Sequence, residues 1–395
     1  MKIFILFVCL CISLFAQEQK LSTLAPTSSV FIDLEEGICD NTCLHELLQS
    51  QQIFSFLSKF NRKNADTIAF DTYNAFRTLL RINETDNINI RIAMLIPQKS
   101  IRRYAITTVN SAISYLLLQD ANFELKVFNS IDEQKNSLQT AITQIKNEGF
   151  LYVIAPLTQQ GVQIVSNEHQ NLLFFIPTIN RSKFPQASAN LFFGGIDYEK
   201  QIDLLLSRSN KKIAIFKDGS ELGEELSQII AQKNPQIVLE QSLENPKTDF
   251  KKMLKTNMKL DDSAVFFNTP LVKTSLLASQ FRFYDRLPAV LLSTQINYNP
   301  LLLTLTQYED RKQLYIANSI TQVPNNIEDI NSLLGHSITY DWVNYASSIG
   351  VDFFYSNYLD PTTNSVFHER IFANQVEYDI AIMQAKRYKF EAVLP

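Results

Sequence analysis

The chain has 395 residues, of which 46% are hydrophobic, and its formal net charge is −4. This length is too great for one ordinary domain and suits two or three, with enough apolar residues for large cores. Acidic and basic residues are interspersed, so the charge pattern predicts no nucleic-acid partner. Only 9 glycines are present, and neither of the common glycine-rich nucleotide motifs occurs, which argues against a phosphate-binding loop.

Residues 1–16 are predicted to be a secretory signal peptide. Lys2 supplies the positive start, and the apolar run that follows is too short to span a bilayer. Ala16 is the expected last residue before cleavage, and an uncleaved anchor is the alternative. Cys9 and Cys11 do not follow the small residue of a bacterial lipidation site, so lipidation is not expected. No later apolar run is long enough to cross a membrane, and we expect a periplasmic protein that spans no membrane after cleavage.

Two cysteines remain after cleavage and follow a polar leader at residues 17–38. An even pair in an oxidising compartment favours a disulfide between Cys39 and Cys43. Their spacing of four residues places both Cβ atoms on one helical turn. The alternatives are two free thiols, or a metal site to which His45 is the only nearby further ligand. We predict the disulfide and no metal.

Two amphipathic helices are predicted in residues 39–82, separated by a turn at 61–64. Apolar residues recur at helical spacing in both, at Leu44, Leu47, Leu48, Phe54 and Leu57 and then at Ile68, Phe76, Leu79 and Leu80. Together they form a short α-helical hairpin. The hairpin is either a cap packed on the main body or a docking module. Residues 83–89 are the expected linker.

A regular alternation of strands and helices starts at residue 90. The predicted strands are 91–97, 124–128, 150–155, 172–176 and 191–193, and the predicted helices between them are 101–120, 132–147 and 158–170. Strands that alternate with helices indicate a parallel sheet with right-handed crossovers. Residues 90–196 therefore form most of a first lobe.

A second series of the same kind follows. Its helices are 198–208, 220–233, 248–259 and 271–284, and its strands are 212–216, 237–240, 264–267 and 289–292. The tail departs from this alternation of helices and strands, with a strand at 314–317, a helix at 338–348 and short strand-like pieces beyond residue 365. Such a tail is expected to cross between the lobes. We predict an α/β protein with two doubly wound parallel-sheet lobes and an interlobe cleft, in which lobe I is 90–196 plus 320–352 and lobe II is 197–319 plus 353–395.

Residues 90–393 resemble the type I periplasmic binding-protein fold. The resemblance rests on the two lobes, on a first strand that ends in Leu-Ile-Pro, on Ala-Pro-Leu-Thr at 155–158, and on Tyr-Asp-Trp at 340–342. Segments 155–162, 177–180, 190–195 and 287–289 are most similar to the C-terminal domain of the lipoprotein activators of class A penicillin-binding proteins. The resemblance implies three crossovers between the lobes and a ligand cleft between them. This chain departs from the activators in its much shorter helical N-terminal part and in lacking the lipidated cysteine.

No motif indicates an enzyme. The four histidines, His45, His169, His336 and His368, lie in unrelated segments. Neither the paired-histidine motif of zinc proteases nor the nucleophile elbow of hydrolases occurs. We therefore expect a binding protein without catalytic activity and without a cofactor.

Polar side chains follow the predicted strand ends, where sheets of this kind bind ligands. The candidate cleft residues are Lys99, Ser100, Tyr104, Thr158, Thr178, Asn180, Arg181, Asp218, Asn268, Thr269, Ser293 and Thr294. Thr158 also opens a helix, whose free N–H groups suit a carboxylate. The alternative for each Ser, Thr or Asn is an ordinary helix cap. Basic residues 99, 102 and 103 form a lip that attracts an anion, blocks the cleft, or is simply a solvated edge.

Two functions remain open from the sequence. The first is an exported, non-enzymatic binding protein that acts in peptidoglycan assembly or regulation through contacts with an envelope protein, such as a peptidoglycan synthase. The helical hairpin and the basic lip favour it. The second is a solute receptor of an ABC-type uptake system, which closes by hinge motion on an amino acid or other small polar ligand. The hydroxyl-rich strand ends favour it.

Overall fold

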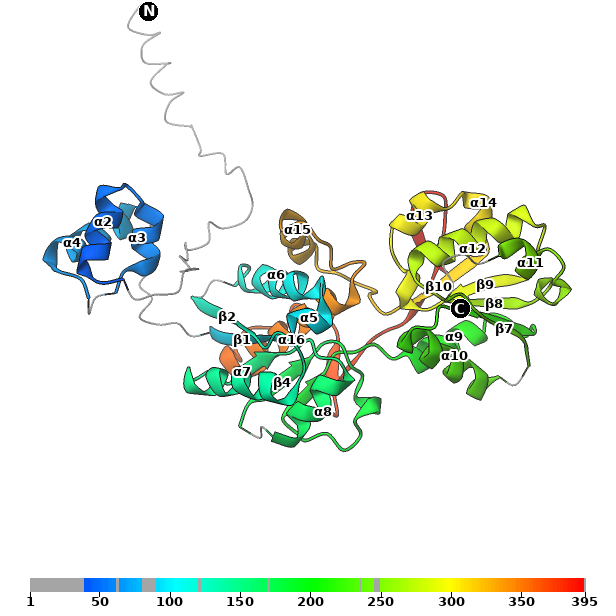
Figure 1. Cartoon of the computed structure of the whole chain (residues 1–395), viewed down its shortest axis with the longest axis horizontal. Coiled ribbons are helices and arrows are strands. Elements are labelled where there is room, and N and C mark those ends of the chain that lie inside the picture. Colours follow the sequence, from blue (N-terminus) through cyan, green and yellow to red (C-terminus); the bar gives the residue numbers. More distant parts are fainter. Residues whose placement is uncertain are drawn as a thin grey trace, which may run out of the picture. The chain divides into compact units, whose positions relative to one another are not determined.

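A computed structural model describes residues 39–61, 64–79, 90–119, 122–168, 171–234, 236–244 and 249–393. The predicted signal peptide and leader, 1–38, lie outside the described residues, as does most of the linker. The chain divides into two units, a small helical unit up to Asn87 and an α/β body from Ile88 (Figure 1). The two units are treated separately.

The described part of the helical unit contains α2 (Asn41–Gln49), α3 (Ile53–Lys59) and α4 (Thr67–Leu79). The prediction of one helix through Leu57 is wrong, because Gln51 adopts φ 57°, a left-handed conformation that ends a helix. The predicted Cys39–Cys43 disulfide is confirmed, with the two Cα atoms 5.3 Å apart. It joins buried Cys39 to α2, so the first described residues of the unit are fixed to its apolar core.

Lobe I contains one seven-stranded sheet in the order β11-β12-β5-β4-β3-β1-β2. Its elements are β1 (Ile90–Ile96), α5 (Gln98–Ile101), α6 (Tyr104–Leu116), β2 (Phe123–Asn129), α7 (Lys135–Asn147), β3 (Tyr152–Ile154), α8 (Gln159–Glu168), β4 (Leu173–Ile176), the 3-10 turn η2 (Arg181–Lys183), β5 (Leu191–Phe193), α15 (Asn325–Leu333), α16 (Trp342–Phe354), η5 (Tyr355–Leu359), β11 (Arg370–Phe372) and β12 (Gln375–Glu377). The neighbours from β2 through β5 pair in parallel. This confirms the predicted doubly wound lobe.

Strand β1 shows why the sheet needs helices on both faces. Its side chains alternate, so that Ile92 and Met94 enter one apolar core and Ala93 and Leu95 enter the other. Strands buried on both faces are largely apolar, as β1 is from Ile92 to Ile96. The first core also receives residues of α6 and α16, and the second receives residues of α7 and α8.

The predicted helix at 101–120 is broken in two. Arg102 adopts φ 50°, and its N–H closes the short α5 by donating to the carbonyl of Gln98. Helix α6 then starts afresh at Tyr104. The break leaves the basic lip as a corner between two helices, directly after the first strand.

Lobe II contains a second seven-stranded sheet in the order β14-β13-β10-β9-β8-β6-β7. Its elements are α9 (Tyr198–Leu206), β6 (Ile213–Lys217), α10 (Glu221–Lys233), β7 (Ile237–Ser242), α11 (Phe250–Leu254), η3 (Met258–Leu260), β8 (Ala264–Asn268), α12 (Leu271–Phe283), β9 (Val290–Ser293), η4 (Gln295–Asn297), α13 (Leu301–Leu305), α14 (Tyr308–Arg311), β10 (Leu314–Asn318), β13 (Ala381–Ala385) and β14 (Phe390–Val393). Figure 1 shows α9 and α10 on one side of this sheet and α11 to α14 on the other.

The chain passes between the lobes three times, after β5, after β10 and after β12. The assignment of residues 353–395 to lobe II is therefore wrong in its first part. Strands β11 and β12 extend the first sheet, where Gln375 pairs with Phe193, and only β13 and β14 join the second. The reason is that α16 runs on to Phe354, whose ring packs in the core of lobe I, so the chain is still in that lobe when it leaves the helix.

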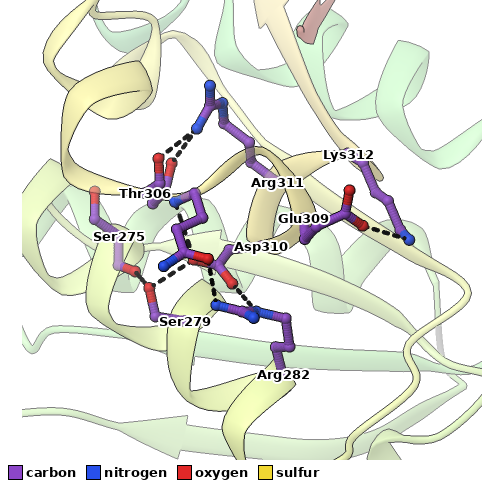
Figure 2. Close-up of polar contacts among 9 residues, drawn as sticks. Ser275, Ser279, Arg282, Thr306, Glu309, Asp310, Arg311 and Lys312 are labelled. Atoms are coloured by element: carbon purple, nitrogen blue, oxygen red, sulfur yellow. Dashed lines mark hydrogen bonds and ion pairs between the residues drawn. The ribbon is translucent and has the colours of Figure 1, made fainter. Parts of the chain in front are cut away.

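A polar cluster anchors the outer helices of lobe II (Figure 2). Asp310 on α14 pairs with Arg282 of α12, accepts a hydrogen bond from Ser279 at 3.1 Å, and caps its own helix at Gln307. The guanidinium of buried Arg311 donates to the carbonyl oxygens of Thr306, Lys386 and Arg387. Helix α14 is thereby tied both to α12 and to the turn between β13 and β14.

Candidate binding cleft

A cavity of about 1330 Å³ lies between the two lobes of the α/β body, beside the carboxyl ends of their parallel strands. This is where the strand order predicts that a ligand would bind. The cavity has eight of the twelve candidate residues in its lining: Ser100, Tyr104, Thr158, Thr178, Asn180, Asp218, Asn268 and Thr269.

The other four candidates do not line this cavity. Lys99 is exposed on α5, and Arg181 lines a separate cavity of about 400 Å³. Ser293 and Thr294 are fully buried, because η4 folds over the end of β9. Asn297 of η4 donates to the hydroxyl of Ser293 at 2.8 Å, and that hydroxyl donates to the carbonyl of Phe267 at 3.0 Å.

The start of α8, which the sequence offered for a carboxylate, already holds one. Buried Glu133 accepts the backbone N–H of Thr158 at 2.7 Å and the Thr158 hydroxyl as well. Gly161 leaves room for it, since a Cβ there would stand 2.8 Å from Oε1 of Glu133. The positive end of α8 is thus neutralised from within the chain.

Several of the cleft candidates bond to their own lobe. The hydroxyl of Thr178 donates to the carbonyl of Leu157, and the amide of Asn180 donates to the carbonyl of Gly195 at 3.0 Å. Asp218 accepts both the N–H and the hydroxyl of Ser220, at 3.2 and 2.6 Å. These bonds fit the alternative of capping, and they also hold each polar group rigidly at the cleft wall.

Asn268 has an unused polar atom, as do Thr107 and Asn344 in the same lining. Its Nδ2 donates to Oγ of Ser227 at 3.0 Å, and that hydroxyl already donates to the carbonyl of Gly223 at 2.7 Å. The amide orientation is therefore fixed, since Ser227 can only accept from it. Oδ1 of Asn268 is buried without a hydrogen-bond partner, so this cleft-lining residue has a spare acceptor.

The basic lip is engaged with neighbouring groups. The guanidinium of Arg103 donates to the hydroxyl of Tyr104 at 2.9 Å and lies 4.9 Å from the centre of that ring. Burial raises the pKa of Tyr104, and the nearby carboxylate of Asp341 raises it further. Burial also raises the pKa of Asp341, which Arg103 partly offsets. Arg103 and Asp341 both line the cleft.

One ion pair bridges the cleft. Nζ of Lys183, on η2 of lobe I, lies 2.6 Å from Oε1 of Glu225, on α10 of lobe II. Burial raises the pKa of Tyr198, with smaller contributions from Tyr104 and Glu225, so groups of both lobes meet here. Sequence reasoning missed Lys183, Tyr198 and Glu225. Lys183 is only two residues beyond the candidate Arg181. Glu225 lies in the second turn of a helix, where the sequence pattern does not distinguish it from other charged residues.

The three histidines in the described part of the chain lie in three separate places. His336 lines the cleft, where its ring nitrogen lies 3.0 Å from Oγ of Ser111, whereas His45 pairs with Asp66 in the helical unit. His368 lies 3.5 Å from Glu369 in lobe I, and His169 is outside the described residues. Over the described ranges, no three metal-ligating side chains cluster and no helix is long and apolar enough to cross a membrane.

No protein-family model and no curated protein sequence matches this chain. Solved structures do match in fold. The isoleucine complex of LivJ, a branched-chain amino acid transporter substrate-binding protein from Streptococcus pneumoniae, covers 78% of this chain and 99% of its own, with 13% identity and a TM-score of 0.57.

Two structures of LpoA from Haemophilus influenzae also match. The C-domain, described as a regulator of PBP1A, covers 77% of this chain and 100% of its own at 12% identity, with a TM-score of 0.50. A longer LpoA structure covers 89% of this chain and 66% of its own, also at 12% identity, with a TM-score of 0.52. The body therefore has the type I periplasmic binding-protein fold, as the sequence resemblance predicted.

Proposed function

We propose that this chain is an exported, non-catalytic binding protein that acts in envelope assembly or regulation through contacts with another protein. The observation that carries the proposal is Glu133 at the start of α8. A free amino acid offers a carboxylate, and a helix start at the cleft wall is a natural place to hold it. In this chain the carboxylate of Glu133 occupies that position and accepts hydrogen bonds from the backbone N–H and the hydroxyl of Thr158.

Two further features support the proposal. The ion pair between Lys183 and Glu225 is a direct contact between side chains of the two lobes. The body also shares its fold with the LpoA C-domain, whose own description is that of a PBP1A regulator. A periplasmic location and an envelope partner such as a peptidoglycan synthase follow from the same proposal.

A solute receptor is the second candidate, and the cavity itself favours it. Its volume of about 1330 Å³ exceeds the roughly 300–1,000 Å³ of ordinary ligand pockets. Asn268 adds a spare acceptor. The LivJ structure with isoleucine shares the fold.

A thermal-shift screen of the mature protein separates the two candidates. Amino acids, peptides and cell-wall fragments are added at saturating concentration, and an envelope extract is probed in parallel for a captured synthase. We expect capture and no stabilisation by any solute. A receptor would be stabilised by mass action, by about 2.7 kcal/mol at one hundred times the Kd, and such a shift with a single solute would overturn the proposal.

Glu133→Ala tests the premise directly. Removing the carboxylate leaves the N–H and the hydroxyl of Thr158 without their acceptor. We therefore expect a loss of about 1–3 kcal/mol in the free energy of unfolding. Formate or acetate should then restore part of that loss in the variant and not in the wild type. Equal effects of these anions on both proteins would contradict the role given to Glu133.

A further inference from the structure

Helix α12 of lobe II is apolar on both of its sides. Its inner side packs Leu277, Ala278 and Phe281 into the core. Its outer side presents Val272, Leu276 and Phe283, which are 68%, 44% and 72% exposed. A surface helix normally keeps polar residues on its outer side, and a helix that is apolar all round is normally covered.

The outer apolar residues form a stripe that is interrupted by Ser279, whose hydroxyl donates to Asp310. Positions 272, 276 and 283 are separated by four and seven residues, so they share one side of the helix. Helix α13 packs beside α12, and its Leu301 and Leu305 are 56% and 49% exposed. These five residues are called the α12 face. Along α12 it extends for roughly 20 Å, the length of about 13 helical residues.

The neighbouring elements α11 and η3 supply positive charge. Helix α11 packs against α12, and Arg286, just beyond α12, reaches both Met258 and Asp261 at η3. Exposed lysines occupy four positions in this segment: Lys251, Lys252, Lys255 and Lys259. No ion pair involves any of the four among the described residues.

The local acids do not offset these lysines. Asp261 pairs with Arg286 at 2.9 Å, and Asp262 pairs with Lys211 at 2.8 Å. Asp249, at the start of α11, is the third acid in residues 249–262, against four lysines. The segment beside the α12 face therefore keeps a small net positive charge, and a partner with complementary charge would be acidic.

We propose that the α12 face docks an amphipathic helix of a protein partner, with leucine-type residues on one side and glutamate or aspartate beside them. The exposed apolar residues of α12 stand at positions i, i+4 and i+11, and a docked amphipathic helix presents its own apolar anchors at i, i+3, i+4 and i+7 along one side. The inference deepens the proposed function, on which it rests, by assigning the surface and the chemistry of the contact.

The test uses a synthetic 18-residue amphipathic peptide of leucine, alanine and glutamate, and a second peptide with lysine in place of every glutamate. Fluorescence anisotropy with the mature protein should show binding of the glutamate peptide, weaker at higher salt, and no binding of the lysine peptide. Leu276→Ser with Phe283→Ser should weaken binding about tenfold or more. Lys252→Glu with Lys255→Glu should weaken it as well and reduce its salt dependence.

Leu151→Ser with Leu333→Ser is the matched control, since these exposed apolar residues lie on lobe I; it should leave binding unchanged. Binding of neither peptide, equal binding of both, or an unchanged Kd in the α12-face variant would overturn the proposal. So would self-association of the wild type that the variant abolishes, because the occupant would then be a second copy. If wild type and variant capture the same synthase equally, this surface fails while the proposed function stands.

Discussion

The buried carboxylate of Asp352 in lobe I makes the free energy of unfolding depend on pH. Asp352 is 2% exposed, and it accepts the N–H of Val366 at 3.0 Å and the hydroxyl of Ser365. Burial raises the pKa of Asp352, and these hydrogen bonds oppose the effect only in part. In the unfolded chain an aspartate titrates near its ordinary value of about 3.9, so the native state binds the proton more tightly.

The sign of the pH dependence follows. Above about pH 4 the unfolded state loses the proton first, so the free energy of unfolding falls as pH rises through the raised native pKa. Asp352→Asn removes this titration and keeps an acceptor for Val366. We expect the stability of the variant relative to wild type to increase with pH, by up to about 1.4 kcal/mol per pH unit, and then to level off.

Urea denaturation between pH 4.5 and 8 measures this difference. Asp285→Asn is the control, because Asp285 is exposed and its φ of 53° suits asparagine. Its curve should run parallel to that of the wild type. A parallel curve for Asp352→Asn would show that burial does not raise the native pKa of this group.

Among the elements, α14 depends on one buried side chain. Arg311 reaches carbonyl oxygens of Thr306, Lys386 and Arg387, which joins the helix to the turn after β13 (Figure 2). Burial lowers the pKa of Arg311, and no carboxylate is bonded to its guanidinium in the described part of the chain. Its guanidinium therefore donates to three main-chain carbonyls, of which that of Thr306 belongs to a buried residue and would otherwise lack this donor.

Arg311→Met keeps the apolar bulk and removes the donors. We expect a loss of about 1–3 kcal/mol in the free energy of unfolding, because the carbonyl of buried Thr306 would be left without this donor. Lys312→Met is the control: its exposed pair with Glu309 should contribute less than about 1 kcal/mol. Chemical denaturation of both variants gives the comparison, and equal losses would contradict the role of Arg311.

At the scale of the whole α/β body, the lobes are joined by three chain segments and by a bridge between side chains. The pair of Lys183 and Glu225 is partly exposed, with the two side chains 37% and 23% accessible. Such pairs contribute at most about 1 kcal/mol, so the bridge biases the cleft toward closure without locking it.

Glu225→Gln should therefore shift the ratio of closed to open molecules by up to about fivefold toward the open form. Single-molecule energy transfer between dyes on the two lobes reports that ratio. Glu224→Gln is the control, since Glu224 pairs with Lys217 inside lobe II and should leave the ratio unchanged. In wild type, high salt should mimic the Glu225 variant, and a salt-independent ratio would rule the bridge out as the closing contact.

Much of the fold could be predicted because its signals are local. Most strands between residues 90 and 317 coincide with buried apolar runs, and the exceptions are the edge strands β2 and β7. The period and length of these runs distinguish the strands from the helices. The disulfide could also be predicted from the sequence, because a spacing of four residues on a helix brings Cys39 and Cys43 together regardless of the surrounding structure. The helix breaks at Gln51 and Arg102 were not predicted. Both residues adopt a left-handed conformation although neither is glycine, so the sequence pattern does not signal the break.

The sequence by itself determined the two α/β series and the strand ends where polar groups gather, because hydrophobic periodicity and turn residues act over a few positions. Only the tertiary structure decided which sheet β11 and β12 join, since short strands of mixed polarity fit either edge. It also decided that Glu133 fills the start of α8 and that Lys183 meets Glu225. Those contacts join residues 25 and 42 positions apart (158 − 133 and 225 − 183), and their geometry depends on how packed elements meet, which no local pattern encodes.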